Sequence, residues 1–260
     1  MAHSKLFAVM PVKSGLRSYG GLPMLDNNKR LAKNTIILYM RMLLTVGISL
    51  YTTRVVMANL GVDDYGLYNV VGGVVSFLYI LTSTLTDAVS RFLTVGIGKG
   101  DLQKLKETFS TSIYLLLLFS VLILVVAETF GLWFVNNQMT FDVARTDAVN
   151  WIYQFSVVTV LLELFSIPYN SLIIAHEKMS AFAFVTIMEV LLKLGVALVL
   201  AFSPIDRLVF YGLLMLIVGL IRQLLYVIYC RRNFQECSFG WQLNRPEMKA
   251  MLKFMGLKWL

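Results

Sequence analysis

Cysteine and histidine are nearly absent from this 260-residue chain, which contains only Cys230, Cys237, His3 and His176. Two cysteines cannot form a disulfide scaffold, and no histidine is close enough to them in sequence to give a zinc-site spacing. The chain also lacks GxGxxG, P-loop, HExxH and GxSxG motifs. We therefore expect no metal, no cofactor and no enzymatic activity.

Charge is also scarce. Only 15% of the residues are charged, 58% are apolar, and the mean hydropathy is +0.72. Soluble domains have about 25% charged and about 45–50% apolar residues. A water-soluble fold of this size could not bury so much apolar surface, so we expect the excess to face lipid. In such a chain the net charge of +8 reflects membrane orientation and does not indicate a nucleic-acid partner.

A membrane-spanning helix needs about 20 mostly apolar residues. Six stretches meet this requirement and are separated by short connections, so we expect an all-α, polytopic six-helix transmembrane bundle. We expect residues 1–30 to be a flexible cytoplasmic tail without a secretory signal, residues 31–232 to be the transmembrane lobe, and residues 233–260 to be a cytoplasmic segment. The expected spans are 34–60, 65–97, 108–134, 148–175, 181–203 and 208–230.

Lysine and arginine predict the orientation of the bundle, because they are enriched in cytoplasmic loops. With a cytoplasmic N-terminus, 16 basic residues fall in inside segments. Only Arg145 and Arg207 fall in outside loops. This asymmetry predicts that both the N-terminus and the C-terminus are cytoplasmic.

The last residues of the chain form a seventh apolar pattern. Met248, Met251, Leu252 and Met255 recur at helical spacing. We expect this to be the start of a truncated seventh span. The alternative is a complete protein that ends in an amphipathic helix at the membrane surface.

Eight charged residues fall inside the expected spans, where a charge at the bilayer centre costs about 2.5–3.5 kcal/mol on insertion scales. From their sequence distance to flanking basic residues, Arg41, Arg91 and Arg222 lie roughly 12–14 Å from the cytoplasmic boundary. They can line a cationic cavity that binds an anionic headgroup, or they can extend to the lipid headgroups. The eight residues are Arg41, Arg54, Arg91, Lys193, Arg222, Asp87, Glu163 and Glu189.

Two of these charges have an opposite charge one helical turn away. Asp87 precedes Arg91 by four residues, and Glu189 precedes Lys193 by four residues. An acid followed by a base at this spacing is the favourable order on a helix. Each pair can therefore neutralise itself inside the bundle or contribute to a functional site.

Several motifs resemble those of bacterial polysaccharide flippases, the O-antigen (Wzx-like) branch of the multidrug/oligosaccharidyl-lipid/polysaccharide exporter superfamily. The resemblance covers about residues 27–260, and the LGVDDYGLYN run is its most specific part. The other motifs are RLAKNTIILYMR from Arg30, YTTRVV from Tyr51, SRF from Ser90, GKGD from Gly98 and IPYNSLIIAHEKM from Ile167.

This resemblance implies a two-lobed transporter of which the chain provides the N-terminal lobe. The implied substrate is an undecaprenyl-diphosphate-linked oligosaccharide, moved across the bacterial inner membrane by alternating access during lipopolysaccharide or other surface polysaccharide assembly. The implied partners are this lipid-linked oligosaccharide, the bilayer and other membrane proteins of polysaccharide assembly.

The residue roles follow from motif position and depth. Arg54 and Arg91 are candidate substrate-binding residues by motif position, and Arg41 and Arg222 by depth. Transport coupled to H⁺ or Na⁺ would use an intramembrane charge, and the candidates are Asp87, Glu163, Glu189 and Lys193.

Two other function classes remain open. A multidrug or cation antiporter of the same superfamily would need carboxylates to dominate the cavity, whereas basic residues outnumber acidic ones here by five to three. A membrane-embedded glycan polymerase or acyltransferase would need a large extramembrane loop or a His/Asp catalytic centre. Neither of these features is visible in the sequence.

Overall fold

The computed structural model describes residues 23–139, 141–237 and 244–257, and these residues form helices and short connections without a β-strand. Eight α-helices and three short helical elements are present in these residues. The helices are α1 (Pro23–Leu60), α2 (Val62–Lys99), α3 (Leu102–Val126), α4 (Leu132–Gln138), α5 (Thr146–Ala175), α6 (Met179–Val199), α7 (Arg207–Asn233) and α8 (Arg245–Leu257). The short elements are the π-helical η1 (Ala127–Gly131) and the 3-10 turns η2 (Val143–Arg145) and η3 (Leu200–Phe202).

The length and composition of these helices confirm an all-α polytopic membrane protein. Five helical segments are long and apolar enough to cross a bilayer: Ala32–Leu60, Leu102–Gln138, Val143–Ala175, Met179–Phe202 and Arg207–Asn233. The two halves of α2, Val62–Tyr79 and Thr82–Lys99, are bent by 41° relative to each other and together have the length and composition of a sixth span. The six spans correspond in order to the six expected from the sequence.

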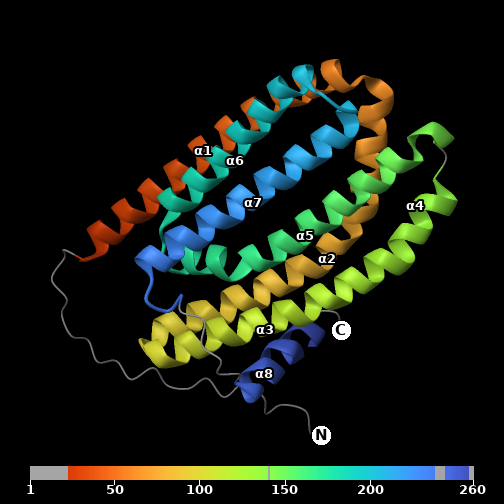
Figure 1. Ribbon diagram of the computed structural model, residues 1–260. Helices are drawn as coiled ribbons and strands as arrows, with labels where there is room; N and C mark the ends of the chain where they lie inside the picture. Colours follow the sequence, from red (N-terminus) through yellow and green to blue (C-terminus); the bar gives the residue numbers. More distant parts are fainter. Residues whose placement is uncertain (1–22, 140, 238–243, 258–260) are drawn as a thin grey trace, which may run out of the picture.

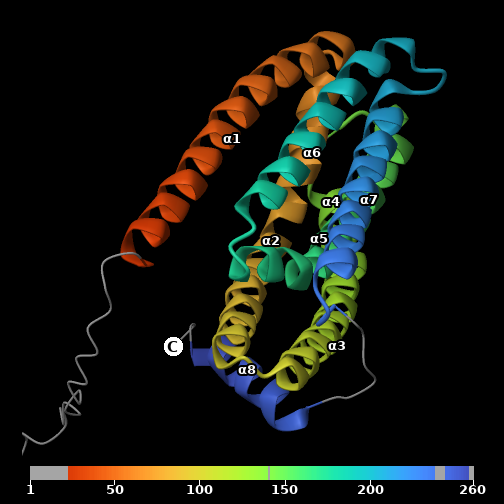
Figure 2. The same ribbon diagram turned by 90° about the vertical axis from the view of Figure 1, so that its left-hand side faces the viewer.

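Helix α5 occupies the centre of the bundle and packs against both α2 and α7, while α1 packs mainly against α6 (Figures 1 and 2). The approach of α7 to α5 requires a small residue at Gly212. A Cβ there would lie 3.2 Å from Phe155 Cδ2 and 3.5 Å from Ile152 Cγ1. Small residues let transmembrane helices pack closely where no water-driven force holds them together.

One end of the bundle carries the described start of α1, the α2–α3 and α5–α6 connections, the end of α7 and α8 (Figure 1). We call it the basic end, because most of the lysines and arginines assigned to the cytoplasm are on these segments. The start of α1 and the end of α7 therefore share one side, as an even number of spans requires.

Helix α1 begins at Pro23, earlier than the expected boundary at residue 31, because proline is well accommodated in a first helical turn. The rest of the expected tail, residues 1–22, lies outside the described residues.

The opposite end, which we call the far end, is held together by the two basic residues assigned to outside loops. Arg145 forms ion pairs with Asp64 at the start of α2, at 2.8 Å, and with Asp206 before α7. Arg207 Nη1 donates a hydrogen bond of 3.0 Å to the carbonyl oxygen of Asn59 in α1. Both outside cations thus connect helix ends at the far end.

Helix α8 lies across the ends of α2 and α3 at the basic end (Figure 2). Its Met251 and Met255 are buried, while Lys249 and Lys253 are exposed. The Thr108 hydroxyl of α3 donates a hydrogen bond to the Glu247 carboxylate of α8. The described α8 is therefore amphipathic and packs on the bundle. Residues 238–243 and 258–260 of the expected cytoplasmic segment lie outside the described residues.

The π-helical turn η1 depends on Gly131. Tyr153 of α5 donates a hydrogen bond of 2.7 Å to the Ala127 carbonyl oxygen, and its hydroxyl oxygen occupies the space where a Gly131 side chain would begin. A Cβ at Gly131 would lie only 2.0 Å from that oxygen. A single extra residue in a helical turn leaves carbonyl groups without their usual partners, and Tyr153 satisfies one of them.

We expect Gly131→Ala to destabilise the protein by about 1–3 kcal/mol, because the added methyl group overpacks this contact. The double variant Gly131→Ala/Tyr153→Phe should recover part of the loss, since it removes the clashing oxygen. The measurement is the midpoint of thermal unfolding in detergent. Gly72→Ala is the matched control, because a Cβ at Gly72 has no neighbour within 4 Å. Equal midpoints for Gly131→Ala and Gly72→Ala would contradict this account.

Candidate functional site

A polar pocket of about 330 Å³ lies between α1, α2, α5, α6 and α7, within helices that cross the membrane. Its walls carry charged groups, hydroxyls and an amide, which are costly to bury in an apolar environment without partners. Such groups inside membrane-spanning helices are typical of substrate or ion sites. The lining residues are Arg41, Thr82, Thr86, Glu163, Ser166, Ile167, Asn170, Phe182, Thr186, Glu189, Arg222 and Tyr226.

Arg222 of α7 is the centre of an ion-pair network in this pocket. Its guanidinium lies 2.9 Å from the Glu163 carboxylate of α5 and 3.3 Å from the Glu189 carboxylate of α6. Glu189 also pairs with Lys193, at 2.7 Å, so this i,i+4 pair forms as its spacing allows. The Arg222 and Glu189 side chains are only 13% and 15% exposed. The network therefore links three helices inside the bundle.

Arg41 of α1 is the remaining cation of the pocket. Its guanidinium lies over the Phe182 ring of α6, 4.7 Å from the ring centre, which is a cation–π contact. Its Nε is buried and has no hydrogen-bond partner among the described residues. The Arg222 Nε and the Asn170 Oδ1 are likewise buried without a partner in the described part of the chain.

The four charged side chains that line the pocket are two guanidinium groups and two carboxylates, so their charges balance, and Lys193 pairs with Glu189 from outside the lining. The carboxylates are already paired, whereas two guanidinium Nε–H donors are not. Arginine binds phosphate and carboxylate groups through parallel N–H donors in a fixed plane. The pocket is therefore suited to bind an anion, with Arg41 and Arg222 as the direct contacts.

Four of the eight predicted site residues do not line this pocket. One of them, Lys193, is connected to it through its ion pair with Glu189, and the other three are Arg54, Arg91 and Asp87. Arg54 is exposed on α1, 13 residues or about 20 Å along the helix from Arg41. Arg91 is exposed near the basic end of α2, and its guanidinium lies 4.6 Å from the ring centre of Phe254 in α8. Asp87 lies one turn before Arg91 on α2 and is also exposed. Their predicted roles remain predictions.

The sequence analysis missed the uncharged polar residues of the pocket. Thr82 and Thr86 on α2 are four residues apart, as are Ser166 and Asn170 on α5, so each pair shares one helix face. Two hydroxyl or amide residues at this spacing within an apolar span are the signal that would have revealed them.

Pro168 shapes the α5 wall of the pocket. It lies inside the helix between Ser166 and Asn170, and a proline there cannot donate a backbone hydrogen bond to the preceding turn. The last turns of α5 run across the bundle (Figure 2), and the Ser166 hydroxyl donates a hydrogen bond of 2.7 Å to the Glu163 carbonyl. The bend brings Ile167 and Asn170 to the pocket wall.

Within the described residues, no group of three or more histidine, cysteine, aspartate and glutamate side chains has the geometry to hold a metal ion. The pocket chemistry is thus that of arginine, carboxylate, hydroxyl and amide groups, with Phe182 as the cation–π partner of Arg41.

Comparison of the chain with protein-family models, with curated proteins and with solved structures finds no match.

Proposed function

We propose that this multi-pass membrane protein is a transporter of an undecaprenyl-diphosphate-linked oligosaccharide. It moves this lipid-linked glycan across the bacterial inner membrane for the assembly of lipopolysaccharide or another surface polysaccharide. The observation that carries the proposal is the polar pocket, where Arg41 and Arg222 present unpaired guanidinium donors inside a membrane-spanning bundle. A diphosphate is an anion that such donors bind well.

The charge balance of the pocket favours an anionic substrate over a cationic drug. Both carboxylates in the pocket pair with cations, and Arg222 holds Glu163 and Glu189 together. A cationic substrate would have to displace Arg222 or Lys193 from these carboxylates. An anion can instead bind at Arg41 without breaking an ion pair of the network.

The proposed mechanism is alternating access without covalent chemistry. The diphosphate binds Arg41 and Arg222, and the motif residues Arg54 and Arg91 act as further substrate contacts outside the pocket. An H⁺ or Na⁺ gradient drives the cycle through an intramembrane carboxylate, for which Glu163 is the best-placed residue. Its one ion pair with a described residue is with Arg222, whereas Glu189 also pairs with Lys193.

Deletion of the protein from its own bacterium tests this proposal. We expect the deletion to abolish surface polysaccharide and to leave the lipid-linked oligosaccharide on the cytoplasmic leaflet. The measurements are polysaccharide staining of whole cells and lipid extraction with leaflet-selective glycosidase treatment. Normal surface polysaccharide together with increased sensitivity to cationic drugs would contradict the proposal and would instead indicate a multidrug antiporter.

A further inference from the structure

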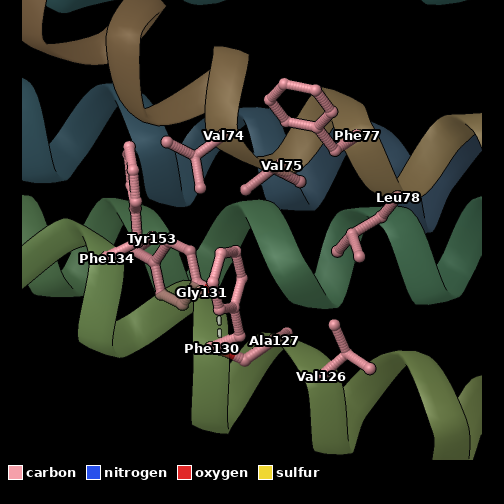
Figure 3. A pocket seen from close by; sticks show the side chains of 10 residues that line it. All are labelled: Val74, Val75, Phe77, Leu78, Val126, Ala127, Phe130, Gly131, Phe134 and Tyr153. Atoms are coloured by element: carbon pink, nitrogen blue, oxygen red, sulfur yellow. Dashed lines mark hydrogen bonds between the residues drawn. The ribbon is translucent and has the colours of Figure 1, made fainter.

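A second, almost entirely apolar cavity of about 520 Å³ lies near the far end of the bundle, away from the polar pocket. Its walls come from α2, from η1 with the adjoining ends of α3 and α4, and from Tyr153 of α5. Figure 3 shows Val74 and Leu78 of α2 pointing across this space toward the wall that carries Val126 and Phe130, with the Phe77 ring at its edge. Its volume is within the range of about 300–1,000 Å³ that is typical of ligand sites.

The cavity offers no polar group to a ligand. The Tyr153 hydroxyl is the polar side-chain group in its wall, and it already donates its proton to the Ala127 carbonyl (Figure 3). A water molecule needs two to four polar partners, so apolar cavities of this kind stay dry. The cavity is therefore suited to a hydrocarbon chain.

The mouth of the cavity opens toward lipid. Phe77 and Phe130 are lining residues, and they are 73% and 61% exposed at a depth where the surrounding medium is the bilayer. The deeper residues Val75 and Ala127 are 3% and 1% exposed. A chain can therefore enter sideways between the two phenylalanine rings and contact a buried wall.

Aromatic residues fix the depth of the cavity. Trp133 and Trp151 are about half exposed near the far end, and tryptophan concentrates at the headgroup level of a bilayer. Phe130 and Val126 precede Trp133 by three and seven residues, so they lie about 4–10 Å closer to the bilayer centre. This is the level of the upper part of the lipid acyl chains in the leaflet at the far end.

The cavity and the polar pocket are on different sides of α5. Figure 1 shows α5 between α7, which lines the polar pocket, and α3, which leads into η1. Tyr153 and Glu163 of α5 are also separated by ten residues, or about 15 Å. The tail of a molecule whose diphosphate binds Arg41 would have to pass around α5 to reach this cavity, whereas an acyl chain of the surrounding leaflet can enter it directly.

We infer that the apolar cavity is a binding site for one acyl chain of a phospholipid from the leaflet at the far end. The chain enters between Phe77 and Phe130 and packs against Val75 and Ala127. The wall is held in shape by the Tyr153–Ala127 hydrogen bond and by the absence of a side chain at Gly131. This site is independent of the proposed transport function.

Photo-crosslinking in defined vesicles tests this inference. The full chain, with a photoreactive amino acid at Phe77, is reconstituted into vesicles of phosphatidylethanolamine and phosphatidylglycerol. The matched control carries the same group at Leu118, which is 57% exposed on α3 and does not line the cavity. We expect a several-fold higher yield of phospholipid adduct at position 77, with the adduct on the acyl chain.

Two further results decide the inference. The variant Val74→Trp fills the cavity and should lower the adduct yield at position 77, whereas Val121→Trp on the exposed face of α3 should not. Equal adduct yields at positions 77 and 118 would overturn the inference. Replacement of the phospholipid adduct by an isoprenoid adduct when undecaprenyl phosphate is added to the vesicles would also overturn it, because the site would then bind the carrier lipid.

Discussion

Replacement of Arg222 by alanine is expected to destabilise the protein by about 3–5 kcal/mol, because it leaves the partly buried Glu163 without a counter-ion and removes one of the two cations paired with Glu189. Arg222 is the only cation that the described structure shows paired with Glu163, and it is one of two cations paired with Glu189. Its own side chain is 13% exposed, so solvent does little to screen the loss. The expected result is a large fall in the thermal midpoint in detergent and a low yield of monodisperse protein.

The pattern of rescue distinguishes an ion-pair effect from a packing effect. Glu163→Gln added to Arg222→Ala should recover most of the stability, because Glu189 keeps Lys193 as its partner. Glu189→Gln added to Arg222→Ala should recover less, since Glu163 keeps its charge without a cation. Arg54→Ala is the control for removal of an exposed arginine and should change stability by no more than about 0.5 kcal/mol. An equal loss in all the Arg222 variants would contradict the network.

Replacement of Arg41 by glutamine is expected to weaken anion binding while the protein remains folded. Arg41 forms a cation–π contact with Phe182, and its Nε has no hydrogen-bond partner in the described residues. A hydrogen bond to a charged group contributes about 1.5–3 kcal/mol, which corresponds to a roughly 10- to 150-fold increase in Kd.

The measurement for Arg41 is a titration of the purified chain with undecaprenyl diphosphate in detergent, followed by tryptophan fluorescence. Lys106→Gln is the control for a change in net charge, because Lys106 is exposed at the basic end and does not line the pocket. The thermal midpoint of Arg41→Gln should stay near that of the unaltered protein. An unchanged Kd for Arg41→Gln would remove Arg41 from the binding site.

Much of the fold was predictable because the membrane imposes strict rules on sequence. A bilayer requires about 20 apolar residues per helical span, and these runs are visible without any tertiary information. The distribution of lysine and arginine anticipated that the start of α1 and the end of α7 share one end of the bundle. The Glu189–Lys193 pair was predictable because four-residue spacing places both side chains on one helix face.

The composition of the site was less predictable, because depth along a helix does not specify which way a residue faces. Arg41, Arg91 and Arg222 have similar predicted depths, yet only Arg41 and Arg222 line the polar pocket. Arg91 is on a face of α2 that meets Phe254 of α8. The orientation of α8 across the ends of α2 and α3 depends on tertiary packing. The spacing of residues along the sequence gives no information about this packing.

The pairing of Arg222 with Glu163 could not be foreseen for a similar reason. These residues are on α7 and α5, and their contact depends on the close packing of the two helices, which also brings Gly212 against Phe155. The same limit applies to Arg145 at the far end, whose partners Asp64 and Asp206 are distant in sequence. The distribution of charges among the loops predicted on which side of the membrane Arg145 lies, but it could not predict the carboxylates with which Arg145 forms ion pairs.

The most direct test of the proposed function is a translocation assay in proteoliposomes that contain the purified full chain. A fluorescent undecaprenyl-diphosphate-linked sugar is placed in the inner leaflet, and its arrival in the outer leaflet is followed with a membrane-impermeant quencher. We predict that the unaltered protein accelerates this transfer over protein-free vesicles and that Arg41→Gln abolishes the acceleration. A transfer rate equal to that of protein-free vesicles, with correctly folded and oriented protein, would contradict the proposal that this chain is a lipid-linked oligosaccharide transporter.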